Sequence, residues 1–223
     1  MKKLIVFDVN ETLLDLEALD LHFERAFGSA AVRKTWFATV LRNSLVATIT
    51  GQYADFGKIA GASLDMTAQQ YTVDLSDVDR AAILGTIRNL PAHADVRPGL
   101  EKLKAAGFRL FTLTNSPPHV VEAQLQNANL SGYFERSFSV DAVRQFKPAA
   151  AVYQMTAREL EVSVEQLRLV AAHDWDVAGA MSAGCAAAFI TRPGKVLNPL
   201  MPKPDIVGSD LMDIADKIVA ADA

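Results

Sequence analysis

The sequence has one cysteine and no long apolar run, and both absences narrow the class of protein. Cys185 has no partner for an internal disulfide, and its setting before three alanines predicts a packed core residue rather than a nucleophile. The longest apolar stretches, such as residues 185–190, are far shorter than the roughly 20 residues that span a bilayer. Residues 1–3 lead directly into a strand-like segment and not into an apolar leader. We therefore expect a cytoplasmic protein without membrane contact.

Clustered positive charge and histidines at metal-ligand spacing are also lacking. The formal net charge is −4, and the lysines and arginines are scattered singly, so no continuous basic surface is predicted. His22, His93 and His119 show no ligand spacing relative to one another. The sequence therefore predicts neither a nucleic-acid partner nor a metal site.

What is present is enough apolar sequence for one full-sized core and a smaller module, since half of the 223 residues are hydrophobic. Short apolar runs typical of buried strands alternate with segments of helical periodicity. This alternation predicts an α/β fold with a doubly wound parallel sheet. The expected strands are residues 4–7, 109–113, 167–171 and 187–190, with a short edge at 205–207, and the expected helices are residues 99–106, 118–128, 149–161 and 177–183.

The alternation is interrupted after the first strand by a long segment that shows only helical periodicity. Apolar residues recur there at steps of three and four, as in Phe23, Trp36, Phe37 and Leu41. These side chains are expected to form the core of a helical insert, with some of them lining a crevice above the sheet. The predicted division is a core of residues 1–15 and 94–223 and an all-helical insert of residues 16–93.

Polar residues follow the predicted strands, where ligands bind in parallel α/β sheets. A carboxylate, a lysine, hydroxyl and amide donors and a second carboxylate would meet in one crevice, which is the composition of an active site. The residues concerned are Asp8 and Thr12, then Thr114, Asn115 and Ser116, then Lys147, and finally His173, Asp174, Trp175 and Asp176.

In their order and spacing these segments resemble the motifs of the haloacid dehalogenase superfamily. The matching stretches are residues 7–13, residues 113–116, Lys147–Pro148 with Tyr153, and Trp175–Asp176. The resemblance extends along almost the entire chain, and it implies that the helical insert is the cap domain of that superfamily. It also implies a Rossmann-like core.

Two departures from the phosphatases of that superfamily bear on the reaction. A phosphatase has an aspartate acid two residues after the nucleophile, where this chain has Asn10, which cannot donate a proton as an acid. It also has paired carboxylates that hold Mg²⁺, and the position four residues before Asp176 is Ala172. A departing halide needs neither group. The chain therefore most resembles the metal-independent type II (S)-2-haloacid dehalogenases, which use no cofactor.

The resemblance implies that Asp8 attacks C2 of a small 2-haloacid, giving an ester and inverted configuration, and that water then attacks the ester carbonyl. Lys147 would hold Asp8 ionised, and Thr12 would orient its carboxylate. Asp176 would orient Lys147 or activate the hydrolytic water, with support from Tyr153.

The substrate carboxylate would be bound, by the same resemblance, at the ends of the first two strands. Thr114 and Asn115 would provide side-chain donors, and the backbone amides near Val9 and Asn10 would provide the others. A homodimer formed through the cap or an edge helix is a further expectation from the family.

Three positions depart from the dehalogenase pattern itself. Asn10 replaces an aromatic wall of the pocket, and His173 stands where the family often has an asparagine. Such enzymes draw off the halide with an arginine of the cap, and the match places Val32 at that position. Arg33, about 100° away around a helix, is carried forward as the neighbouring candidate, with Arg42 after it. A small pocket with N–H donors from His173 and Trp175 would suit fluoride, so fluoroacetate is a hypothetical substrate.

Each of these residues also has a structural interpretation. Asp8 could cap a turn, Lys147 could be a solvated loop residue, and His173 could be a hydrogen-bonded structural residue. Trp175 could be a core aromatic, and Asp176 could be the N-cap of the following helix. Two other functions stay open, namely a phosphatase with Mg²⁺ held by Asp8 and Asp176, and a binding protein without catalytic activity.

Overall fold

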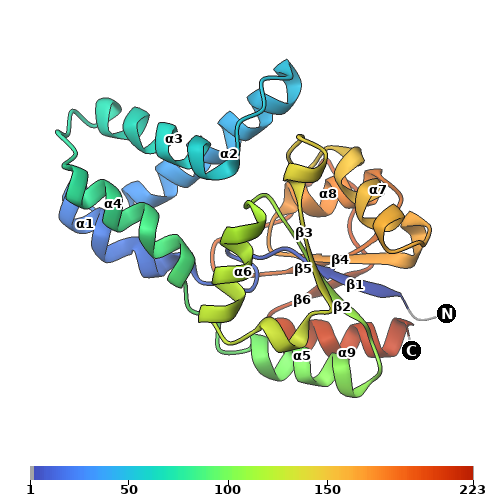
Figure 1. The fold of residues 1–223 in the computed structure, drawn as a ribbon. Helices are drawn as coiled ribbons and strands as arrows, with labels where there is room; N and C mark the ends of the chain where they lie inside the picture. The colour runs from blue at the N-terminus through green and yellow to red at the C-terminus, as the bar shows by residue number, and fades with distance from the viewer. Residues whose placement is uncertain (1–2, 223) are drawn as a thin grey trace.

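The computed structural model describes residues 3–222, and in this part of the chain an all-parallel sheet carries the strands in the order β3-β2-β1-β4-β5-β6 (Figure 1). Strand order reverses between β1 and β4, so the sheet is doubly wound and the predicted fold class is confirmed. The strands are β1 Leu4–Phe7, β2 Leu110–Thr114, β3 Arg136–Ser139, β4 Leu167–Ala171, β5 Ala186–Ile190 and β6 Ile206–Gly208.

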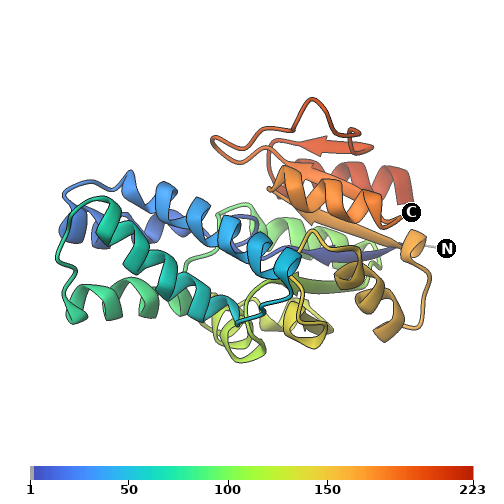
Figure 2. The ribbon, with the colours of Figure 1, turned by 90° about the horizontal axis from the view of Figure 1, so that it is seen from above.

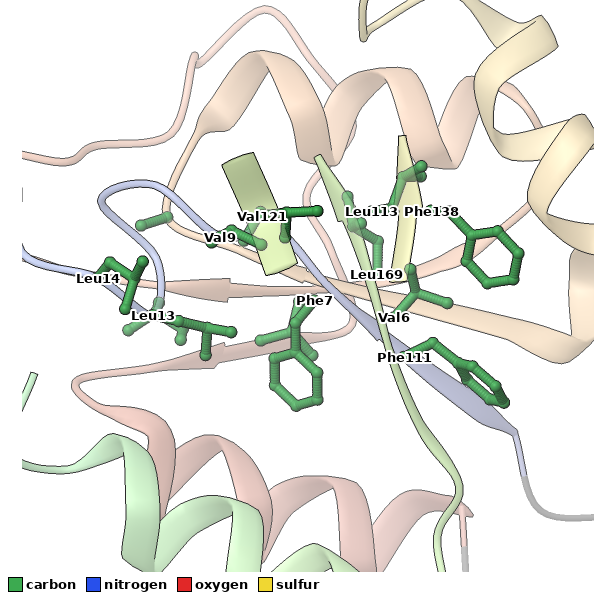
Figure 3. Close-up of a cluster of buried hydrophobic side chains, with 14 of the residues drawn as sticks. Val6, Phe7, Val9, Leu13, Leu14, Phe111, Leu113, Val121, Phe138 and Leu169 are labelled. Carbon is green, nitrogen blue, oxygen red and sulfur yellow. The ribbon is translucent and has the colours of Figure 1, made fainter. Parts of the chain in front are cut away.

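Strand β1 lies at the centre of the sheet and is buried along its whole length. Ile5 pairs with Leu110 on one side and with Arg168 on the other. The apolar run continues beyond the strand, because Val9, Leu13 and Leu14 also contribute to the core around β1, β2 and β4 (Figure 3). Burial of apolar surface on both faces explains why the first strand is a continuous apolar run.

Strand β3 was missed by the sequence prediction, which also omitted the C-terminal helix α9, Leu211–Asp222. Three of the four residues of β3 are polar, and only Phe138 is large and apolar. As an edge strand, β3 has only one neighbour, β2, so it needs no continuous apolar run. The predicted edge at residues 205–207 corresponds to β6.

Helices cover both faces of the sheet. Helices α5 and α9 pack against each other on one face, and α7 and α8 lie on the other (Figure 1). Gly99 permits the close contact of α5 with α9, because a Cβ atom there would lie 2.6 Å from Cγ of Leu211. The core helices are α5 Val96–Ala105, α6 Pro118–Asn127, α7 Ala150–Glu159, α8 Asp174–Ser182 and α9 Leu211–Asp222, with 3-10 turns η3 Ser131–Tyr133, η4 Val140–Ala142 and η5 Val164–Gln166.

The segment inserted after β1 is helical and lies to one side of the sheet, far from both chain ends (Figures 1 and 2). Asp55 and Ser76 cap α3 and α4 with their side chains, and Gly28 and Gly51 end α1 and α2 in the left-handed conformation. Its elements are η1 Leu16–Leu19, α1 Asp20–Phe27, α2 Val32–Thr50, α3 Phe56–Gln70, α4 Asp77–Thr86 and η2 Ile87–Asn89.

The two connections between this insert and the core run side by side. The Asp15 amide donates to Pro91 O at 2.8 Å, and the His93 amide donates to Leu13 O at 3.0 Å. We keep residues 16–93 as the proposed limits of the insert, called the cap below. Within residues 3–222, no helix combines the length and apolar character needed to cross a membrane.

Candidate active site

Asp8 is the first residue beyond β1, at the point where strand order reverses. Its amide donates to Val170 O of β4 at 3.0 Å, so the sheet sets its position. The side chain is almost completely buried, and each carboxylate oxygen is bound. Thr12 Oγ1 donates to Oδ2 at 2.6 Å, and Lys147 Nζ donates to Oδ1 at 2.8 Å. Thr12 is itself held, because its hydroxyl accepts from the Ala172 amide at 2.9 Å.

Lys147 is buried and uses all three of its N–H donors. Besides Asp8, its ammonium group binds Oδ2 of Asp176 at 2.6 Å and the Leu113 carbonyl at 3.0 Å. Burial alone would lower the pKa of Lys147, but the carboxylates of Asp176 and Asp8 raise it above its ordinary value. Lys147 is therefore a charged, immobile group, and its interpretation as a solvated loop residue was wrong.

Asp176 is bound through both carboxylate oxygens. Tyr153 donates its hydroxyl hydrogen to Oδ1 at 2.6 Å, while Lys147 occupies Oδ2. Burial raises the pKa of Asp176, and burial together with Asp176 raises the pKa of Tyr153. The N-cap of α8 is His173, so the expectation that Asp176 caps this helix was wrong. Asp176 lies in the first turn of the helix and holds Lys147.

His173 bridges two carboxylates. Its Nδ1 lies 3.0 Å from Oδ2 of Asp8, and its Nε2 lies 2.9 Å from Oε2 of Glu11. The ring stacks on Trp175 at a centroid distance of 4.9 Å. Burial alone would lower the pKa of His173, but the two carboxylates raise it to about 9. The ring is therefore a cation at neutral pH, with both N–H groups donating.

These cations determine the charge state of the carboxylates. Burial would raise the pKa of Asp8, but Lys147 and His173 hold it well below its ordinary value. Burial would likewise raise the pKa of Glu11, but His173 and Lys195 lower it to about 2. Lys195 Nζ lies 2.6 Å from Oε2 of Glu11. Both carboxylates are therefore ionised at neutral pH.

Donors for an anionic ligand lie at the ends of β1 and β2. The backbone amides of Val9 and Asn10 donate to no other residue within 3–222, and neither does Nδ2 of Asn115. Oδ1 of Asn115 accepts from the Lys147 amide at 3.1 Å, and Thr114 Oγ1 accepts from the amide of Ser116 at 3.1 Å. The Val9 side chain belongs to the core, so only its backbone is available (Figure 3).

The side chain of Asn10 is held by other polar groups. Gln124 Nε2 donates to Oδ1 of Asn10 at 2.9 Å and to the Ile87 carbonyl at 2.9 Å, and Nδ2 of Asn10 lies 3.4 Å from Ser116 Oγ. Gln124 therefore joins the loop after β1, helix α6 and the end of the cap.

Two cavities between the cap and the core adjoin the loop after β1, which supplies Glu11 to the first and Asn10 to the second, and Asp8 itself lines neither. One, of about 560 Å³, is lined by Glu11, His173 and Trp175, and the other, of about 630 Å³, by Asn10 and Ser116. Both cavities share two apolar residues. Leu16 and Phe37 line both, Leu41 lines the first, and Trp36, Val40 and Phe56 line the second.

Arg33 lies on cap helix α2 and reaches the first cavity. Its side chain is buried and forms an ion pair with Asp20, and its Nη2 lies 4.0 Å from Oε1 of Glu17. Arg42, further along the same helix, is exposed and lines neither cavity. Of Arg33 and Arg42, Arg33 is the one that lines a cavity.

The sequence prediction omitted several residues that position the site. Glu11 stands inside the first motif but was given no role, although a carboxylate between Asn10 and Thr12 was visible. Arg192 binds the Thr12 carbonyl through Nη2 at 2.9 Å and Asp95 through Nη1 at 2.7 Å, and no local pattern marks it. Among residues 3–222 no group of three or more His, Cys, Asp or Glu side chains is arranged to hold a metal ion.

Comparisons with known proteins give a consistent picture. The model of a family described as haloacid dehalogenase-like hydrolase matches residues 2–184. (S)-2-haloacid dehalogenase 1 of Pseudomonas sp. (strain CBS-3) is 29% identical over 85% of each chain, and haloacetate dehalogenase H-2 of Moraxella sp. (strain B) is 27% identical over 92% of this chain and 93% of its own. The structure of the L-2-haloacid dehalogenase from Xanthobacter autotrophicus is 25% identical, covers 100% of both chains and has a TM-score of 0.92.

Proposed function

Because the chain belongs to the haloacid dehalogenase-like hydrolases, we propose that it hydrolyses the carbon–halogen bond of short 2-haloalkanoic acids of the (S) configuration. The observation that carries this proposal is the buried, ionised carboxylate of Asp8, held by Lys147 and Thr12 at the start of a loop that lines two cavities with Asn10 and Glu11. A fixed anion of low basicity suits attack on carbon.

In the first half-reaction, a carboxylate oxygen of Asp8 attacks C2 of the substrate. A C–O bond forms, the carbon–halogen bond breaks, and its electron pair leaves with the halide. Lys147 and Thr12 restrict the carboxylate to one orientation, which lowers the entropic part of the barrier. No acid is needed, because a halide is a stable anion. Asn10 is therefore compatible with this step although it cannot donate a proton.

The substrate is an anion, and the charges around Asp8 admit it. The carboxylates of Asp8, Asp176 and Glu11 are balanced by Lys147, His173 and Lys195. The substrate carboxylate would accept hydrogen bonds from the backbone amides of Val9 and Asn10, from the Asn115 amide and from the Thr114 hydroxyl. The apolar residues Leu16 and Phe37 would contact its short alkyl group.

In the second half-reaction, water attacks the carbonyl carbon of the Asp8 ester and releases a 2-hydroxyacid. Lys147 offsets the negative charge that develops on the ester oxygen. Asp176 acts here through Lys147, because both of its oxygens are already bound by Lys147 and Tyr153.

The finer proposal concerns the halide. The two ring nitrogens of His173 are bound to carboxylates, so the donors left for a halide are Asn115, the indole N–H of Trp175 and the cap residue Arg33. Compact N–H donors favour fluoride, a strong hydrogen-bond acceptor, and fluoroacetate is therefore a proposed substrate. Cytoplasmic location and a homodimer stay predictions.

The test is halide release from (S)-2-chloropropionate and from fluoroacetate in the presence of EDTA, with Asp8→Asn as the matched variant. The proposal predicts chloride release by the wild type and none by the variant. Fluoride release no faster than in buffer would remove fluoroacetate and leave the chloride chemistry intact. Release of phosphate from a phosphate ester that requires Mg²⁺, without halide release, would contradict the proposal.

A further inference from the structure

A continuous chain of ion pairs connects Asp8 with the edge of the site. It runs from Lys195 to Glu11 at 2.6 Å, from Glu11 to His173 at 2.9 Å, and from His173 to Asp8 at 3.0 Å. The side chain of Lys195 is 25% exposed, whereas that of His173 is only 5% exposed. The chain thus passes from solvent to the reacting carboxylate, along the cavity of about 560 Å³.

Glu11 determines which nitrogen of His173 keeps a proton. Its carboxylate binds Nε2 and is held in turn by Lys195, so the neutral ring retains its hydrogen on Nε2. The lone pair is then on Nδ1, which faces the carboxyl group of Asp8. A nitrogen at this distance from Oδ2 is within reach of a water molecule that attacks the adjacent carbonyl carbon.

The second half-reaction needs a base that the other residues do not provide. Lys147 is a cation with all three N–H groups donating, and both oxygens of Asp176 accept hydrogen bonds. The Tyr153 hydroxyl donates to Asp176. His173 is therefore the remaining titratable side chain in direct contact with Asp8.

We propose that Glu11 and His173 form a base dyad for ester hydrolysis, and that formation of the Asp8 ester switches His173 from a cation to a base. This inference rests on the proposed function and adds Glu11 as a positioning residue. Before the reaction, the imidazolium donates to ionised Asp8 through Nδ1. Esterification of either oxygen removes that negative charge, so the imidazolium loses half of its electrostatic support and releases the Nδ1 proton into the adjoining cavity.

The proton balance closes over one turnover. Halide leaves in the first half-reaction, and His173 releases one proton to solvent. In the second, the oxygen of water forms a bond to Cγ of Asp8 while Nδ1 accepts one of its hydrogens. The C–O bond between Cγ and the ester oxygen then breaks, and the 2-hydroxyacid leaves with the other hydrogen. Asp8 is again a carboxylate and His173 is again a cation.

The groups that surround the His173 ring indicate that formation of the Asp8 ester is sufficient to cause this switch. Asp8 and Glu11 are the carboxylates in contact with His173, and Lys147 and Lys195 bind these same carboxylates. Phe37 of the cap and Trp175 of α8 pack against the ring and are uncharged. Further charged groups that line the cavity are Arg33, Lys34, Glu17, Asp15, Asp174 and Arg192. Among these neighbours of His173, Asp8 is the one whose charge changes when the ester forms.

The variants Glu11→Gln and His173→Asn test the dyad. With excess (S)-2-chloropropionate, both are expected to release about one chloride per active site rapidly and then to turn over slowly, with the ester on Asp8 detected by mass spectrometry. The expected loss in kcat is about 10²- to 10⁴-fold for His173→Asn and on the order of 100-fold for Glu11→Gln. In the pH profile of kcat, the acidic limb should move to lower pH in Glu11→Gln, because the loss of an anionic partner lowers the pKa of the His173 ring.

The matched control is Glu161→Gln. Glu161 is exposed and, like Glu11, has a positive φ, 56° against 60°. It should retain the kinetics of the wild type. A kcat for Glu11→Gln equal to that of the control, or slower halide release without ester accumulation, would overturn the dyad. If Glu11→Gln does not fold, His173→Asn decides by the same criterion. A wild type without halide release contradicts the proposed function itself.

Discussion

Lys147 Nζ lies 2.8 Å from Oδ1 of Asp8, although 139 residues separate the two in the sequence. The side chain of Lys147 is 1% exposed and that of Asp8 is 7% exposed, so the pair is shielded from water. Breaking a buried ion pair by removing one partner leaves an uncompensated charge and typically costs about 3–5 kcal/mol.

The variant Lys147→Met should therefore lose activity and unfold more easily. Its free energy of unfolding should fall by about 3–5 kcal/mol in a urea titration, because Asp176 then has no cationic partner and Asp8 keeps only His173. Lys58→Met is the control, since Lys58 is exposed and its pair with Asp55 should contribute no more than about 1 kcal/mol. Equal losses in the two variants would mean that the buried pair has no special role.

His173 should make stability depend on alkaline pH. Its pKa is about 9 in the folded protein and 6.5 as the ordinary value, so its contribution is complete below pH 6.5 and disappears as the pH rises through 9. The difference in Tm between the wild type and His173→Asn should shrink over that window. The shift in the pKa of His173 corresponds to a contribution of at most about 3 kcal/mol to the free energy of unfolding. A difference independent of pH from 6 to 10 would indicate that His173 is neutral in the resting protein.

Arg33 and Arg42 provide a comparison on one helix. Arg33→Met should raise the KM for the 2-haloacid by about 10- to 100-fold, the effect of losing a hydrogen bond to a charged group. Arg42→Met should leave the KM unchanged, because Arg42 is exposed and lies outside both cavities. The measurement is steady-state chloride release. The same KM in both variants would restrict Arg33 to holding Asp20 within the cap.

Gly179 determines how closely α8 approaches the segment that carries Lys147. A Cβ atom at Gly179 would lie 2.3 Å from Cβ and 2.8 Å from Cα of Pro148, so Gly179→Ala must displace backbone. We expect a lower Tm, because overpacking of about 1–3 kcal/mol outweighs the gain in helix propensity of up to about 1 kcal/mol. The kcat should fall as well, since Lys147 moves with Pro148.

Gly85→Ala is the control for this substitution. Gly85 also lies within a helix, α4, but a Cβ atom there meets nothing within 4 Å. It should raise the Tm and leave the kcat unchanged. An increase in Tm for both variants would show that α8 has room beside Pro148.

Much of the site could be predicted from the sequence because the carboxyl ends of parallel strands meet at one edge of a sheet. Asp8, Thr114 and His173 each follow a predicted apolar strand. Predicting that one strand is enough to place the residue after it at this edge. Lys147 follows no strand, and only the order of the motifs pointed to it. Strand β3 was missed because three of its four residues are polar. Helix α9 was missed although its buried residues follow helical spacing, namely Leu211, Ile214, Ala215 and Ile218.

The sequence by itself determined the doubly wound sheet, the helical insert and the residue types available for chemistry, since these depend on apolar periodicity and on positions along one strand. Only the tertiary structure decided the partners of those residues. His173 could have faced a halide, but it lies between Asp8 and Glu11. Asp176 could have capped a helix, but it holds Lys147. Such choices depend on side-chain directions at loops and helix ends from distant parts of the chain, and no local pattern encodes them.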